Sequence, residues 1–171
     1  MAEPPVRIVL VGFMGAGKTS VGKALAERLR WSFVDLDAAI EARAGSAIAE
    51  IFERSGEPAF RELERDAARD ALRAEHVVVA AGGGAFAEPA TRALLRAAAT
   101  VYLECDLETL LARVALDGSR PLAGDRETMR RLLLAREAAY RSADVTLDAS
   151  HGTPAELALR VARALSLPLS G

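Results

Sequence analysis

The sequence predicts an α/β protein with three layers, in which helices cover both faces of a five-stranded parallel sheet. Short apolar segments typical of strands alternate along the chain with longer segments whose apolar residues recur at helical spacing. This alternation is typical of parallel strands joined by crossover helices. With 171 residues, of which 51% are hydrophobic, the chain has the size of one ordinary domain, and we expect residues 1–171 to form it.

Five apolar runs are predicted to form the strands. Each is short and rich in valine, isoleucine or aromatic residues, and glycine or acidic residues follow most of them. In chain order they are residues 6–11, 33–35, 77–81, 100–104 and 145–148.

The segments between these strands are predicted to be helical. Val21, Leu25 and Leu29 share one face of the first helix, and Pro58 suits the start of a later one. Gly45 and Gly56 separate two short helices. The predicted helices are residues 18–29, 37–44, 47–54, 58–74, 88–96, 107–114, 126–141 and 154–165, with a charged loop at 117–125.

The bulk composition excludes several classes of protein. The net charge of −2 gives no general bias toward nucleic acid or membranes, and no run approaches the roughly 20 apolar residues of a membrane span. Cys105 is the only cysteine, so we exclude an intramolecular disulfide and interpret Cys105 as a core residue. The N-terminal MAEPPVR lacks the pattern of a secretory signal. We expect a cytoplasmic monomer whose partners are small molecules.

Residues 12–19, GFMGAGKT, fit the phosphate-binding pattern G-x-x-x-x-G-K-[ST] in the confirming context between a predicted strand and helix. Such a loop turns backbone N–H groups toward phosphate oxygens, and the helix N-terminus adds partial positive charge. Lys18 would reach the β- and γ-phosphates, and Thr19 could bind Mg²⁺. Lys18 is informative because Lys18 and Lys23 are the only lysines among 22 basic residues. The predicted ATP-binding residues here are Gly15, Ala16, Gly17, Lys18, Thr19 and Ser20.

The chain contains neither asparagine nor glutamine, which narrows the possible phosphate acceptors. A GTPase switch would need an Asn-Lys-x-Asp motif and usually a glutamine, and a protein kinase would need a catalytic-loop asparagine. Both classes are therefore excluded.

Asp35 and Asp37 are candidate ligands of a metal and a substrate. If residues 33–37 are extended, both carboxylates point to the same side, and positive charge would be needed between them. Mg²⁺ beside Asp35 and a substrate hydroxyl at Asp37 would explain the pair. The alternative is that Asp37 only caps the following helix.

Arg61 and Glu64 are neighbours on one predicted helix face, where the glutamate could orient the guanidinium for a carboxylate. The alternative is a solvated ion pair worth less than about 1 kcal/mol. Gly82, Gly83 and Gly84 follow an apolar strand, where open α/β sheets bind ligands.

The motifs GFMGAGKT, DLD, FRELE, GGG, RPLAG and RxxxY (Arg136–Tyr140) occur together in this order, and the chain resembles the shikimate kinases over nearly its whole length. The resemblance implies a P-loop NTPase fold with a lid at about 116–126 and a substrate-binding helical segment at about 37–64. It also implies ATP with Mg²⁺ and phosphorylation of the 3-hydroxyl of shikimate, on the route to aromatic amino acids.

The resemblance also implies roles for individual residues. Asp37 is the candidate base and binds substrate hydroxyls, while the carboxylate is held by Arg61 and Arg136, with Glu64 orienting Arg61. The glycines 82–84 form the substrate floor, and Asp35 arranges Mg²⁺ through water. Lys18 and the lid Arg120 would act on the transferring phosphate, and Arg113 and Pro154 fall where the family packs adenine. The lid motif departs slightly, with Ala123 where leucine is common.

Two alternatives accompany this interpretation. A related kinase could phosphorylate another hydroxylated acid such as gluconate, which the charge chemistry alone permits. A catalytically idle nucleotide-binding regulator would be expected to lose Lys18, Asp37 or Arg120, and all three are present.

Overall fold

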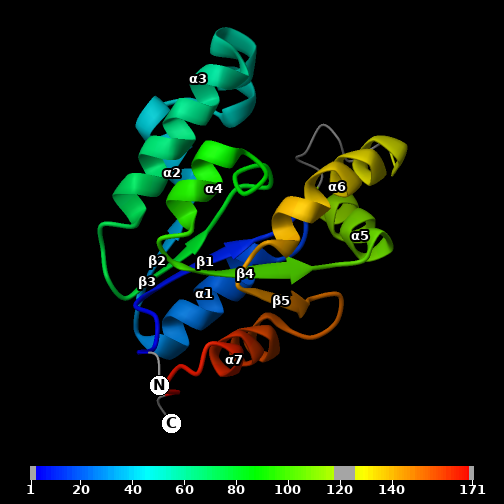
Figure 1. Cartoon of the computed structure of the whole chain (residues 1–171). Helices are drawn as coiled ribbons and strands as arrows, with labels where there is room; N and C mark the ends of the chain where they lie inside the picture. The colour runs from blue at the N-terminus through cyan, green and yellow to red at the C-terminus, as the bar shows by residue number, and fades with distance from the viewer. Residues whose placement is uncertain (1–2, 118–125, 170–171) are drawn as a thin grey trace.

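A computed structural model describes residues 3–117 and 126–169 of the chain (Figure 1). Five parallel strands form one sheet in the order β2-β3-β1-β4-β5. This confirms the predicted fold class. The strands are β1 (Arg7–Val11), β2 (Ser32–Asp35), β3 (Val77–Ala80), β4 (Ala99–Glu104) and β5 (Val145–Asp148).

Helices cover both faces of the sheet. In Figure 1, α1 and α7 lie together on one side, and α3, α4 and α6 lie on the other. The helices are α1 (Lys18–Leu29), α2 (Leu36–Ala44), α3 (Ile48–Ala71), α4 (Pro89–Leu95), α5 (Leu107–Asp117), α6 (Arg126–Arg141) and α7 (Pro154–Ala164).

The helical run α3 changes direction at Gly56, where the sequence predicts a break between two helices. Gly56 has φ 78° and ψ 173°, which is not a helical conformation, and Pro58 follows it inside the run. Positive φ is readily adopted only by glycine, and Pro58 removes a backbone donor, so both residues favour a break here. The predicted interruption is confirmed.

The segment after β2 is not extended as far as Asp37, which was the condition for both carboxylates to point to the same side of a strand. The strand ends at Asp35, and α2 begins at once with Leu36, which is fully buried. Asp35 accepts a hydrogen bond from the amide of Ala38 at 3.2 Å and is therefore the N-cap. Asp37 lies in the first helical turn, so the alternative that Asp37 caps this helix is wrong.

The central strand β1 positions the loops that carry the candidate site. Ile8, Val9, Leu10 and Val11 are completely buried, as expected for a parallel strand covered on both faces. Leu10 and Asp35 are both in register with Ala80 of β3. The carboxyl ends of β1, β2 and β3 therefore lie side by side, where ligands bind in open α/β sheets.

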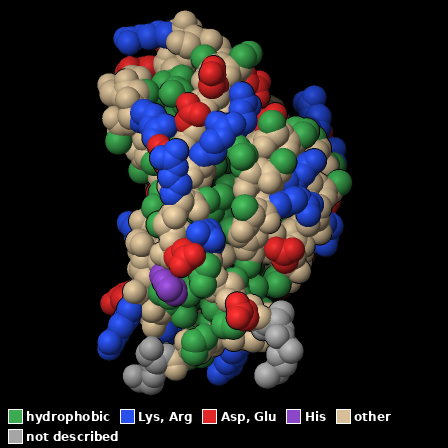
Figure 2. Space-filling model, turned by 60° about the vertical axis from the view of Figure 1, so that its left-hand side comes forward, with side chains coloured by type: hydrophobic (Ala, Val, Ile, Leu, Met, Phe, Trp, Pro, Cys, Tyr) green, Lys and Arg blue, Asp and Glu red, His purple; other side chains and the backbone are tan. Residues whose placement is uncertain are grey.

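The remaining global features concern the surface and the single cysteine. Cys105 is buried, which confirms its interpretation as a core residue. On the face drawn in Figure 2, basic side chains are interspersed with acidic ones, with apolar surface between them. Within residues 3–117 and 126–169, no helix has both the length and the apolar character that crossing a bilayer requires.

Candidate active site

The loop between β1 and α1 has the conformation of a phosphate cradle. Gly15 and Gly17 adopt φ values of 84° and 93°, which other residues rarely tolerate. Gly17 is the N-cap of α1 and offers no side chain to its first amides. The start of α1 therefore has no side-chain cap, and a helix N-terminus of this kind favours an anion.

Lys18 folds back over this loop. Its Nζ donates hydrogen bonds to the carbonyl oxygens of Gly12 at 2.5 Å and Phe13 at 3.1 Å. Both acceptors are neutral, whereas charge-assisted bonds to phosphate oxygens are stronger. The ammonium is thus held at the mouth of the cradle, where a phosphate oxygen can replace a backbone carbonyl as its hydrogen-bond acceptor.

Thr19 and Asp35 place two oxygen atoms together at the end of the cradle. The Thr19 hydroxyl donates to Asp35 Oδ2 at 2.8 Å. Mg²⁺ in phosphate-binding enzymes takes one or two oxygen ligands from the protein and others from phosphates and water. The side chains of Thr19 and Asp35 therefore fit a Mg²⁺ that accompanies a nucleotide.

One cavity of about 840 Å³ joins the phosphate cradle to Asp37. Lys18, Thr19 and Asp35 line it, and so do Asp37 and Gly83. A volume of this size suits a small molecule together with the terminal phosphate of a nucleotide. One chamber thus contains candidates for binding the phosphate and candidates for binding the acceptor, although Thr19 and Gly83 are 64 residues apart in the sequence.

The three glycines after β3 form a floor against which the charged side chains pack. A Cβ at Gly82 would lie 2.6 Å from Asp37 Oδ1, and one at Gly84 would lie 2.6 Å from Arg61 Nη2. Contacts under 3.0 Å force a displacement, so any larger residue at Gly82 or Gly84 would push these groups apart. The absence of side chains lets Asp37 and Arg61 approach the backbone.

Arg61 and Glu64 form a buried pair rather than the solvated pair considered as an alternative. Arg61 Nη1 donates to Glu64 Oε1 at 2.7 Å, and the Glu64 side chain is 1% exposed. Burial raises the pKa of the Glu64 carboxyl, and the charge of Arg61 opposes this rise. The pairing fixes the direction of the Arg61 guanidinium.

Arg136 reaches the same floor from α6. A Cβ at Gly84 would lie 3.2 Å from Arg136 Nη2, close to the Arg61 guanidinium. The Arg136 guanidinium also lies 5.8 Å from the ring centroid of Phe13 in the cradle loop. Two guanidinium groups from different helices therefore converge beside Gly84, an arrangement suited to a carboxylate.

Arg113 and Pro154 lie on the other side of the cradle. Two clefts of about 340 and 230 Å³ meet there, and both include Gly17, Ser20 and Arg113. Pro154 lines the smaller one. The clefts open beside the helix N-terminus, where the remainder of a nucleotide held by its phosphates would lie.

Arg113 also forms hydrogen bonds that stabilise the cradle loop. Its guanidinium donates to the carbonyls of Gly15 and Ala16, both at 3.2 Å, and to Ala149 at 3.1 Å. The sequence resemblance implied only a contact with adenine. These bonds tie the cradle to the segment after β5, so Arg113 supports the loop whichever ligand it contacts.

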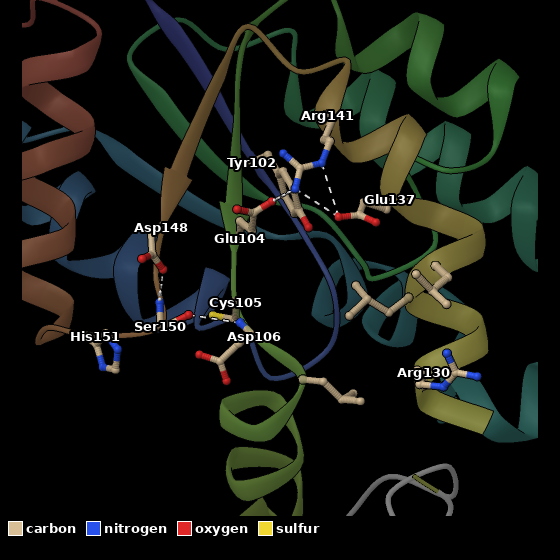
Figure 3. Close-up of a pocket in the computed structure, with 13 residues that line it drawn as sticks. Tyr102, Glu104, Cys105, Asp106, Arg130, Glu137, Arg141, Asp148, Ser150 and His151 are labelled. Carbon is tan, nitrogen blue, oxygen red and sulfur yellow. Dashed lines mark hydrogen bonds and ion pairs between the residues drawn. The ribbon is translucent and has the colours of Figure 1, made fainter. Parts of the chain in front are cut away.

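Another cavity, of about 540 Å³, contains none of the predicted site residues (Figure 3). It lies between α6 and the ends of β4 and β5. Figure 3 shows Arg141 between Glu104 and Glu137, with which it forms ion pairs. The lining carries four carboxylates and two guanidinium groups, so its charge does not favour an anion. The N-terminus of α5, which begins at Leu107, lies in this cavity and is already capped, because Asp106 accepts a hydrogen bond from the amide of Thr109.

The structure adds an apolar wall to the candidate site that the sequence analysis missed. Met14, Ile48 and Phe52 line the same cavity as Lys18 and Asp37. Ile48 and Phe52 are four residues apart on α3, and Phe52 is 38% exposed. An apolar pair at this spacing within the predicted substrate-binding segment is the signal that could have found them. The lid residue Arg120 lies outside the described residues.

The chain is similar to known proteins over nearly its whole length. A family model described as shikimate kinase matches residues 14–166. A shikimate kinase of Cereibacter sphaeroides is 44% identical over 170 residues, which cover 97% of this chain and 85% of that protein. A shikimate kinase of Geobacter sulfurreducens is 50% identical over 145 residues, covering 82% and 80% respectively.

Solved structures give the same result. A shikimate kinase from Acinetobacter baumannii in complex with shikimate superposes with a TM-score of 0.88 at 37% identity, covering 95% of this chain and 93% of that one. A tunicamycin resistance protein from Deinococcus radiodurans, at 21% identity and a TM-score of 0.72, shares the fold over 99% of both chains.

Proposed function

The chain belongs to the shikimate kinase family, and on this premise we propose how its residues phosphorylate shikimate. The reaction transfers the γ-phosphate of ATP to the 3-hydroxyl and gives shikimate 3-phosphate and ADP. The observation that supports our assignment of residues is the shared chamber, which is lined by Lys18 and Thr19 together with Asp37 and Gly83.

On the nucleotide side, the cradle binds the triphosphate through the amides at the start of α1 and through Lys18. Lys18 moves from the loop carbonyls to the transferring phosphoryl group and stabilises the charge on its oxygens. Thr19 and Asp35 hold Mg²⁺, which supplies further charge neutralisation when bound. We assign Gly15, Ala16, Gly17, Ser20, Arg113 and Pro154 to ATP binding, and Arg120 to the transferring phosphate by family resemblance.

On the acceptor side, Arg61 and Arg136 bind the carboxylate of shikimate beside Gly84. Asp37 accepts hydrogen bonds from the substrate hydroxyls and takes the proton of the 3-hydroxyl as it attacks. Met14, Ile48 and Phe52 cover the apolar part of the ring and limit the entry of water. Catalysis then arises mainly from positioning the hydroxyl in line with the γ-phosphate.

We further propose that the protein works as a cytoplasmic monomer, without nucleic-acid or membrane partners. The described cradle, floor and guanidinium pair all come from one chain. The net charge of −2 offers no electrostatic preference for a polyanion.

The test of this function is an ADP-release assay with ATP, Mg²⁺ and a panel of hydroxylated acids that includes shikimate and gluconate. We expect rapid ADP release only with shikimate, and mass spectrometry should find the phosphate on its 3-hydroxyl. Faster turnover with gluconate would contradict the choice of acceptor. Binding of ATP without turnover of any acid would instead indicate the idle regulator.

The raised pKa of Glu64 predicts that shikimate binding weakens in acid. As the pH falls through the folded pKa of Glu64, which burial holds above its ordinary value of 4.5, Glu64 gains a proton and loses its charge-assisted bond with Arg61. We expect the KM for shikimate to rise by about tenfold as this bond is lost. Initial rates at saturating ATP across this pH range measure the change.

The variant Glu64→Gln is the control for this pH dependence, because it removes the titrating group and keeps the side-chain shape. Its KM should be raised at all pH values and should vary less with pH than that of the wild type. Identical pH profiles for the two proteins would contradict the assignment to Glu64.

The effect of Glu64 on stability has the opposite dependence on pH. Because its folded pKa is raised above the ordinary value of 4.5, Glu64 favours folding at low pH, and its contribution to the free energy of unfolding declines as the pH rises through the folded pKa. Acid unfolding through Glu64 therefore does not cause the expected rise in the KM for shikimate at low pH.

A further inference from the structure

Tyr140 belongs to the motif Arg136–Tyr140, yet the proposed chemistry uses only its arginine. The two residues lie one turn apart on α6, so their side chains leave the same face of the helix. Tyr140 is completely buried, and its ring stacks on that of Tyr102 in β4 with centroids 5.1 Å apart and planes at 27°. The hydroxyl of Tyr140 is thereby held in one place.

That hydroxyl is bonded to the substrate floor. It donates a hydrogen bond to the carbonyl oxygen of Gly83 and contacts the Arg136 guanidinium. The peptide group between Gly83 and Gly84 is planar, so its carbonyl and its N–H point in opposite directions. While the carbonyl of Gly83 faces Tyr140, the N–H of Gly84 must face away from it.

Gly84 lies where the two substrate-binding arginines meet. An ideal Cβ on it would be 2.6 Å from Arg61 Nη2 and 3.2 Å from Arg136 Nη2. Glycine peptides rotate easily because no Cβ restricts φ and ψ. Without an external constraint, the peptide between Gly83 and Gly84 could turn its carbonyl toward an incoming carboxylate, which would repel it.

We propose that Tyr140 is a positioning residue that fixes the peptide between Gly83 and Gly84 so that the N–H of Gly84 faces the carboxylate of the substrate. The same hydroxyl steadies Arg136, so a single side chain aligns two donors to one anion. This inference rests on the proposed function, because the carboxylate is that of shikimate. Burial raises the pKa of Tyr140 to about 12, so the hydroxyl remains a donor at all pH values at which the enzyme would work.

The test is the variant Tyr140→Phe, which removes the hydroxyl and keeps the ring and its stacking. We expect the KM for shikimate to rise by about tenfold, since the partly buried carbonyl of Gly83 loses its donor and the floor loses its alignment. The KM for ATP should stay within about twofold, because the phosphate cradle is untouched. Tyr102→Phe is the matched control, since it removes a hydroxyl from the other ring of the stack, which lines the cavity in Figure 3 and should leave both KM values unchanged.

Three kinetic outcomes would overturn the inference: an unchanged KM for shikimate in Tyr140→Phe, equal increases in both KM values with a lowered Tm, or the same shift in Tyr102→Phe. If Tyr140→Phe does not fold, amide exchange in the wild-type protein decides instead. Shikimate should slow hydrogen exchange at Gly84 by about tenfold or more, and unchanged exchange there would refute the proposal. Wild-type protein that does not phosphorylate shikimate would disprove the function itself, which distinguishes the two failures.

Discussion

Replacing Lys18 with alanine is expected to lower kcat by about a thousandfold. In the structure its ammonium lies over the cradle, bonded to the carbonyls of Gly12 and Phe13. During transfer, charge spreads over the γ-phosphoryl oxygens, and a preorganised cation beside them lowers the barrier more than it strengthens binding of ATP. Loss of one such group costs about 10² to 10³ in kcat in enzymes that stabilise an oxyanion. Steady-state ADP release at saturating ATP and shikimate measures the effect.

Lys23→Ala is the matched control. Lys23 is the other lysine of the chain, lies in the same helix and is exposed. Its loss should leave kcat and both KM values close to those of the wild type. Comparable losses in the two variants would mean that general charge or helix stability matters more than the position of Lys18. A Lys18→Ala protein with nearly normal kcat would contradict the assignment directly.

The fold could be predicted because its local signals agree. Residues 8–11 of the central strand β1 are an uninterrupted apolar run bounded by a glycine, and the structure buries them completely. Gly56 and Pro58 marked the break within α3. What the sequence could not give was the order of the strands, because order depends on which apolar faces find each other in three dimensions. The central position of β1, which brings three strand ends together, is known only from the structure.

The cradle was predictable for a different reason from the acceptor site. All its groups lie within eight consecutive residues, so spacing alone fixes their geometry. Arg61, Gly84 and Arg136 come from three distant segments, and only the motif order suggested that they meet. The burial of Glu64 illustrates the limit. Spacing predicted its bond with Arg61, but a solvated pair and a buried pair have the same spacing.

Asp37 shows how a local error can leave a site prediction intact. Extended geometry was the reason given for placing its carboxylate beside that of Asp35, and the segment is helical instead. Asp35 accepts a hydrogen bond from the amide of Ala38 and caps the helix, which begins at Leu36, one residue before the predicted start. Both carboxylates still line one cavity, since the first turn of α2 starts at the strand end that faces the cradle.

Asp37→Asn is expected to lower kcat for shikimate phosphorylation by about a hundredfold. Asparagine has nearly the same shape and can still accept a hydrogen bond, but it cannot take the proton of the attacking hydroxyl. General-base contributions are typically 10² to 10⁴ in rate. The KM for shikimate should change by less than about tenfold, because Arg61 and Arg136 still hold the carboxylate.

The slow hydrolysis of ATP without acceptor separates the roles of Asp37 and Lys18. Lys18 acts on the phosphoryl group, so Lys18→Ala should slow transfer to water and to shikimate alike. Asp37 acts on the acceptor hydroxyl, so Asp37→Asn should slow transfer to shikimate and leave ATP hydrolysis unchanged. Asp66→Asn, at an exposed ion pair on α3, controls for the general effect of losing a carboxylate. If Asp37→Asn slows both reactions equally, Asp37 serves the nucleotide or the metal, and the division of this chamber into a phosphate side and an acceptor side is wrong.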